Sequence, residues 1–213
     1  MKQKIFILSI FLLGLGGIIA QVILLRELLV VFYGNELCVG IILANWLILE
    51  AIGSFFGGRY IETSKRKIES FVVVQIIFSL FFPLAVYFSR TFKSIWGFIP
   101  FEGLGVFSVF VVSGAILSVV AITHGALFSF GCKIFSQVSR EEKAASVGRV
   151  YVYEVLGTLA GGILLTYLLI PYFSSFQIVF VIASLNLIVG ISLLVFLSKI
   201  RFNKRLFICI SCF

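Results

Sequence analysis

The sequence predicts an all-α integral membrane protein with six transmembrane helices. Its 213 residues are 61% hydrophobic and only 12% charged, whereas about 25% of the residues in soluble domains are charged. The mean hydropathy is +1.19. The apolar residues fall into runs of about 20, the length that crosses a bilayer as a helix. We therefore expect a single transmembrane domain over residues 1–213.

Six apolar runs give the expected spans in chain order. The first follows Lys2 and Lys4 and resembles a secretory signal peptide, but apolar sequence resumes after Glu27 and no small-x-small cleavage site is evident. We therefore expect it to be retained as a first span. A basic cytoplasmic tail is expected at 199–213. The spans are 5–32, 37–58, 69–88, 104–132, 150–171 and 175–198.

Local capping signals support two of the helix starts. Asn35 can cap the second span, and Ser139 with Glu142 has the spacing of a capping box for the fifth. The fifth helix would then begin with a segment that contains Lys143 and Arg149. We expect that segment to project from the membrane before the helix enters lipid.

Basic residues lie mainly on one side of the expected membrane. Fourteen fall on that side and two, Arg90 and Lys93, on the other, with Arg26 left within or at the edge of the first span. By the positive-inside rule, both termini are cytoplasmic. This clustering between apolar runs explains the net charge of +8 without nucleic-acid binding. The fourteen are Lys2, Lys4, Arg59, Lys65, Arg66, Lys67, Lys133, Arg140, Lys143, Arg149, Lys199, Arg201, Lys204 and Arg205.

A glycine pattern, E-x-x-G-x-x-x-G-G, occurs twice. At about 100° per residue, the Glu and the first two glycines of each copy share one helix face. In lipid such a smooth face lets a second backbone approach closely, so these glycines are expected to pack helices together, within the chain or in a homodimer. The two copies are Glu50, Gly53, Gly57 and Gly58, and Glu154, Gly157, Gly161 and Gly162.

The two copies predict an internal inverted repeat. They lie 104 residues apart, as do Asn35 and Ser139, so the similarity extends to the helix starts. Because the second span runs inward and the fifth outward, the units at about 5–88 and 104–198 would be related by an inverted repeat, as in many transporters. The alternative is that two ordinary glycine packing motifs match by chance.

Glu50 and Glu154 are the leading candidates for a binding site. A carboxylate deep in a bilayer costs about 2.5–3.5 kcal/mol on insertion scales, so each should face the bundle interior and have a partner. A functional carboxylate would couple protons or bind an organic cation. A structural one would be held by an arginine, by Asn45 or by a backbone N–H.

Four further polar residues lie within or beside the spans: Gln21, Arg26, Glu27 and His124. Adjacent helical positions diverge, so we expect Arg26 to pair with a carboxylate on another helix and Glu27 or Glu36 to line an outward opening. Alternatively, Arg26 and Glu27 form an interfacial pair. The single histidine is expected to be a buried, hydrogen-bonded residue, with proton relay as the alternative. No ligand stands at metal spacing from it, so no metal is expected.

Soluble catalysis has no place in this chain. It contains no P-loop, no dinucleotide fingerprint and no Ser/His/Asp set in a soluble segment. Cys209 and Cys212 have C-x-x-C spacing but lack the βαβ context of a redox site, so we interpret them as thiols in an apolar tail; a thiol relay is the alternative. We predict neither an enzyme nor a cofactor.

Several of these strings, taken in order, resemble the membrane portion of membrane-integrated spermidine synthase-like proteins, which is related to half of a major facilitator transporter. The resemblance runs from about Phe6 to Leu197, and Gly57 to Glu62 with Lys65 to Lys67 is similar to the facilitator loop between helices two and three. Ser129 stands where a proline is expected. The strings are Gln21-Val-Ile-Leu-Leu-Arg26-Glu27-Leu, Gly34-Asn-Glu36-Leu, Gly53-x-x-x-Gly57-Gly58-Arg59 and Gly148-Arg149-Val-Tyr151-x-x-Glu154-x-x-Gly157.

The resemblance implies a module of a prokaryotic cytoplasmic membrane that binds or transports polyamine-like cations. Glu50 and Glu154 would supply the negative site, with Glu27 at its outer mouth. In such proteins a cytoplasmic aminopropyltransferase domain follows the membrane portion, and this chain stops before one. The alternative is therefore a non-catalytic membrane scaffold that anchors a separate soluble aminopropyltransferase or another partner through its basic loops.

Overall fold

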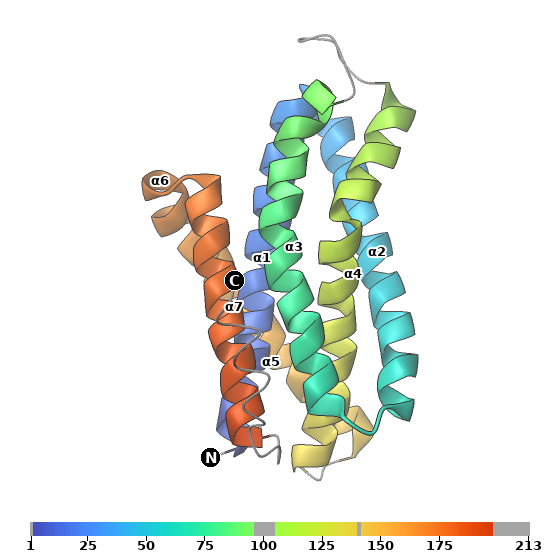
Figure 1. The fold of residues 1–213 in the computed structure, drawn as a ribbon, viewed down its shortest axis with the longest axis vertical. Helices are drawn as coiled ribbons and strands as arrows, with labels where there is room; N and C mark the ends of the chain where they lie inside the picture. Colours follow the sequence, from blue (N-terminus) through green and yellow to red (C-terminus); the bar gives the residue numbers. More distant parts are fainter. Residues whose placement is uncertain (1, 96–104, 140–141, 198–213) are drawn as a thin grey trace.

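The structure is a computed structural model that describes residues 2–95, 105–139 and 142–197, and this part of the chain is all-helical. The long helices alternate in direction through an elongated bundle (Figure 1). Their bounds are α1 Lys2–Phe32, α2 Glu36–Thr63, α3 Lys67–Ile95, α4 Val106–Ser139, α5 Lys143–Leu164 and α7 Ser175–Leu197, with a π-helical turn at Leu165–Leu169 and the short α6 at Ile170–Tyr172 continuing α5.

Six helical segments of the described chain are long and apolar enough to cross a membrane, which confirms the predicted number of spans and supports a multi-pass membrane protein. Large apolar side chains such as Leu47, Phe55 and Leu159 lie on the outside, as expected where the surroundings are lipid. The spans are Gln3–Phe32, Glu36–Thr63, Lys67–Phe92, Val106–Ser139, Ala144–Tyr172 and Ser175–Val195.

The start of α1 and the end of α7 lie at the same end of the bundle, which we call the terminal end (Figure 1). The turn from α2 to α3 and the end of α4 lie there too. Five helices extend past their predicted spans at this end: α1 begins at Lys2, α2 continues to Thr63, α3 begins at Lys67, α4 continues to Ser139 and α5 begins at Lys143. The basic residues of these extensions are therefore carried on helices that project beyond the apolar spans.

Two close helix pairs dominate the packing: α2 lies along α4, and α5 lies along α1. Both depend on glycine. A methyl group on Gly53 would overlap the Ile122 carbonyl oxygen of α4, and one on Gly157 would overlap the Phe11 carbonyl oxygen of α1. Each pair is therefore held backbone to backbone, as small residues allow in lipid.

The glycine faces are thus used within one chain. Gly57 packs on Ala126 of α4, and Gly161 packs on Leu15 of α1. The first two glycines of each motif are covered by α4 and α1. The last glycine of each motif differs: Gly58 has only Ser129 within ordinary contact, and Gly162 faces open space. A homodimer stays a prediction.

One capping prediction is confirmed and one is wrong. The Asn35 side chain accepts hydrogen bonds from the backbone N–H groups of Leu37 and Cys38 at 3.1 and 3.3 Å. Ser139 does not start the fifth helix: it is the last residue of α4, where its hydroxyl donates to the Phe135 carbonyl at 2.8 Å. Glu142 occupies the N-cap position of α5 without a side-chain capping bond. The capping-box prediction failed because α4 continues past the apolar run.

Candidate functional site

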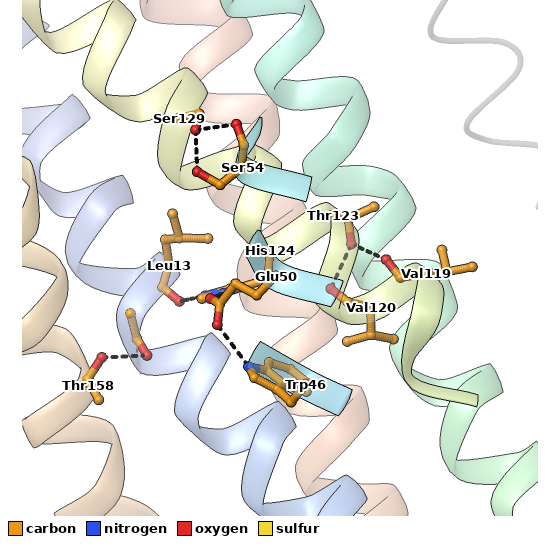
Figure 2. A network of polar contacts seen from close by, with 11 residues as sticks. Leu13, Trp46, Glu50, Ser54, Val119, Val120, Thr123, His124, Ser129 and Thr158 are labelled. Carbon is orange, nitrogen blue, oxygen red and sulfur yellow. Dashed lines mark hydrogen bonds and ion pairs between the residues drawn. The ribbon is translucent and has the colours of Figure 1, made fainter. Parts of the chain in front are cut away.

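Glu50 of α2 and His124 of α4 form a partly buried pair (Figure 2). The His124 Nδ1 atom lies 2.5 Å from Oε1 of Glu50, and the second carboxylate oxygen accepts a hydrogen bond from Trp46 Nε1 at 3.1 Å. Trp46 and Glu50 are four residues apart and so share a helix face. The His124 side chain is 7% exposed and that of Glu50 28%, so the carboxylate is the more open partner.

The other imidazole nitrogen reaches α1. His124 Nε2 lies 3.3 Å from the Leu13 carbonyl oxygen, and Gly17 makes room for it, because a methyl group there would overlap the ring. A carbonyl only accepts hydrogen bonds, so Nε2 carries a hydrogen, and a neutral ring would leave Nδ1 as an acceptor. One further proton must then lie between Nδ1 and Glu50, on either atom. The pair is therefore a proton-holding site.

Aromatic rings cover one side of this pair. The ring centroids of Trp46 and Phe78 lie 6.2 and 6.0 Å from that of His124. Both rings are buried, so they exclude water from the imidazole and strengthen its bond to Glu50 in a low-dielectric setting.

Glu154 of α5 is the second carboxylate of the site. It is partly buried and lies close enough to both His124 and Glu50 to interact with them electrostatically. The hydrogen bonds and ion pairs found among the described residues do not include one to its carboxylate. Its backbone is fixed by α1, since a methyl group on Gly14 would overlap the Glu154 carbonyl oxygen, just as one on Gly125 would overlap that of Glu50.

Two other candidates lie outside this cluster. The Asn45 amide donates to the Phe110 carbonyl and the Ser113 hydroxyl, both at 2.8 Å, so it joins α2 to α4 and does not hold Glu50. Gln21 is half-buried on α1 and takes part in none of the hydrogen bonds of the cluster. The structure thus brings Glu50, Glu154 and His124 together and leaves these two apart.

Glu27 has a partner that the sequence analysis did not assign to it. The guanidinium of Arg90 on α3 donates two hydrogen bonds of 2.6 and 2.7 Å to its carboxylate. The same guanidinium lies 4.6 Å from the Phe176 ring centroid of α7. Arg26, expected to make an interhelical ion pair, is exposed instead. Arg26 fails to pair because it lies on the exposed side of α1, and the Glu27–Arg90 pair was missed because Arg90 was assigned to an outer loop, whereas α3 continues past it.

The sequence analysis missed Trp46 and Arg90. It also missed Ser54 and Ser129, which form a hydrogen bond of 2.7 Å between α2 and α4. Only Trp46 carried a usable signal, its four-residue spacing from Glu50. Among the described residues, no group of three His, Cys, Asp or Glu side chains could hold a metal ion. Cys209 and Cys212 lie outside the described residues.

Comparisons with protein-family models, with curated proteins and with solved structures find no match to this chain.

Proposed function

We propose that this chain is a membrane module that binds an organic cation of the polyamine class between Glu50 and Glu154. The observation that carries the proposal is the second carboxylate: Glu154 lies near Glu50 and His124, yet no hydrogen-bonded cation accompanies it among the described residues. A carboxylate in a bilayer normally has a partner or marks a ligand path. A ligand with several ammonium groups would supply the missing positive charge.

The shared proton suggests how binding would be coupled. An ammonium group that approaches Glu50 competes with His124 for the same carboxylate, and the proton between Nδ1 and Oε1 is then easier to release. Binding of the cation and loss of a proton would be linked, as in a proton-coupled transporter. We accordingly favour transport or regulated binding over permanent occupancy.

The same proposal includes an inverted repeat of two three-helix units and a resemblance to the membrane portion of spermidine synthase-like proteins. The repeat is supported by equivalent contacts: Gly53 meets Ile122 as Gly157 meets Phe11, and Gly125 meets Glu50 as Gly14 meets Glu154. A residue of α2 in these contacts has its counterpart 104 residues later in α5. A residue of α1 has its counterpart 111 residues later in α4.

Residues near the axis of such a repeat should contact their own counterparts. Gln75 of α3 and Asn186 of α7 are 111 residues apart, and the Gln75 amide donates to the Asn186 side chain at 3.3 Å. Leu13 and His124, also 111 apart, are hydrogen-bonded to each other. With the basic clusters at the terminal end, this repeat would sit in a prokaryotic cytoplasmic membrane with both termini inside.

Thermal unfolding of the purified protein in detergent, with and without spermidine, tests the binding site. At about 100 times its dissociation constant, a ligand stabilises the folded state by about 2.7 kcal/mol, so the unfolding temperature of the wild type should rise. Glu50→Gln and Glu154→Gln should each remove most of the rise, because each deletes one of the two charges.

Glu36→Gln is the matched control, since it removes the same charge from an exposed position at the start of α2. It should keep the full response. Magnesium at equal ionic strength should produce no comparable rise in unfolding temperature. If no variant and no concentration gives a response to spermidine, the proposal fails and the scaffold alternative, which needs only the basic loops, becomes the better account.

A further inference from the structure

A polar ladder connects the Glu50–His124 pair to the terminal end of the bundle. Along α2, a polar or small residue recurs at every turn: Glu50, Ser54, Gly58 and Glu62. Three of these face polar partners on α4. The contacts are Glu50 to His124 at 2.5 Å, Ser54 to Ser129 at 2.7 Å and Glu62 to Lys133 at 3.2 Å.

A crevice opens beside Gly58, the one position of the ladder that has no polar partner on α4. Its volume is about 260 Å³, enough for several waters at roughly 30 Å³ each. The space exists because Gly58 does not pack tightly against α4, unlike Gly53 and Gly57. Residues from α2, α4 and α5 line it: Gly58, Ile61, Glu62, Phe128, Ser129, Cys132, Lys133, Ser136 and Val147.

One residue that lines the crevice lies near the second carboxylate. Cys132 lines it and is close enough to Glu154 to interact electrostatically, and Glu154 in turn interacts with His124 and Glu50. The mouth is marked by Glu62 and Lys133, whose side chains are 62% and 24% exposed. Polar groups at successive turns are about 5.4 Å apart along a helix, a spacing that waters can bridge.

In the opposite direction the open space is apolar: a cavity of about 370 Å³ between α3 and α4 is lined by side chains such as Phe81, Phe88 and Val119. On the other side of Glu50 from Ser54 lies Trp46 (Figure 2), and beyond it Asn45 is tied to Phe110 and Ser113 of α4. Farther along, the Glu27–Arg90 pair joins α1 to α3. Packing alone would explain hydrogen bonds between helices, but it would not explain a crevice lined by Glu62, Ser129 and Lys133 on one side and a purely apolar cavity on the other.

We propose that the crevice between α2, α4 and α5 is the route by which water, protons and cations reach Glu154, Glu50 and His124 from the terminal end, with the Glu62–Lys133 pair lying across its mouth. This inference rests on the proposed function only in taking the two carboxylates as the destination. The access route itself is independent of which cation binds.

Native Cys132 reports on the route. In membrane vesicles that hold the full chain with Cys38, Cys209 and Cys212 replaced by Ser, a membrane-impermeant cationic methanethiosulfonate is applied from either side. The thiolate attacks its sulfur, a disulfide forms and methanesulfinate leaves, which requires a water-exposed thiol. Cys132 should react from the terminal end and not from the opposite side. Glu62→Gln should accelerate the reaction by up to about fivefold, the range of an exposed ion pair.

The matched control compares two neighbouring positions on α2, one on the ladder and one on the outside. With Cys132 also replaced by Ser, Ser54→Cys lies on the ladder and should react, whereas Phe55→Cys, whose native side chain is 54% exposed on the outside, should not. Equal reaction at the two positions would overturn the route. So would reaction of Cys132 only from the opposite end, or only after detergent is added.

The labelling experiment tests the route and the spermidine experiment tests the cation proposal, so either proposal can be refuted without the other. If Cys132 reacts from the terminal end but spermidine does not alter unfolding, the route stands and the cation proposal falls. If spermidine stabilises the wild type through Glu50 while Cys132 stays inert in well-folded protein, the ligand must enter elsewhere and the route falls.

Discussion

The site depends on His124, because its imidazole contacts groups from three helices. These are Glu50 and Trp46 of α2, the Leu13 carbonyl of α1 and Phe78 of α3. The counterpart of His124 in the proposed repeat is Leu13 itself, an apolar residue. If the proposed repeat is present, its two halves differ at the position that holds the proton in our proposal, and the site is asymmetric within a symmetric framework.

This arrangement makes Glu50 and His124 energetically dependent on each other. Glu50→Gln or His124→Leu should each destabilise the protein by about 1–3 kcal/mol, because a buried polar group then loses its partner. The double variant should cost less than the sum, with a coupling of about 0.5–3 kcal/mol. Denaturant unfolding in mixed micelles measures both quantities. Strictly additive effects would mean that the two side chains do not share a proton.

Sequence reasoning identified the members of this pair but not the pairing. Glu50 was expected to need an arginine, Asn45 or a backbone N–H, and His124 was expected to be buried and hydrogen-bonded, which is confirmed. The two are 74 residues apart, and no local spacing predicts which turns of α2 and α4 face each other. That register depends on tertiary contact between Gly125 and the Glu50 backbone.

At the scale of the helix, the glycine motifs fix two pairs. Gly53→Ala should destabilise the protein by about 1–3 kcal/mol, as overpacking does, because the added methyl overlaps the Ile122 carbonyl. Gly162→Ala is the matched control: its methyl meets open space, and alanine favours the helix by up to about 1 kcal/mol. Thermal unfolding should therefore move in opposite directions for the two variants. A similar shift for both would contradict the backbone contact seen at Gly53.

The sequence predicted where the apolar spans lie, but not how far the helices extend into the polar segments beside them. Hydropathy located the spans, since lipid-crossing runs need apolar residues, but it could not show that α4 continues to Ser139 or that α3 reaches past Arg90. Helices that project beyond the membrane are polar and look like loops in a hydropathy profile. The wrong capping box at Ser139 and the missed Glu27–Arg90 pair come from this source.

For the whole molecule, the arrangement of basic residues predicts the orientation. A reporter that is active only in the cytoplasm should be active when fused to the N-terminus or inserted at Ser64, in the turn between α2 and α3. A reporter that is active only outside the cytoplasm should be active when inserted in the turn before Asn35. Protease protection in sealed vesicles gives an independent measure. An external N-terminus would reverse the side from which Cys132 must be labelled.

The backbone contacts at Gly14, Gly53, Gly125 and Gly157 have a mechanical consequence. Where two main chains touch, no side chain can change rotamer to let one helix slide, so α2 with α4 and α1 with α5 should each behave as a rigid lever. The interface between α3 and α7 is separated by side chains such as Gln75 and Asn186, which can reorient. Any rocking of the α2–α4 pair against the α1–α5 pair should therefore turn about the α3–α7 seam and leave both levers intact.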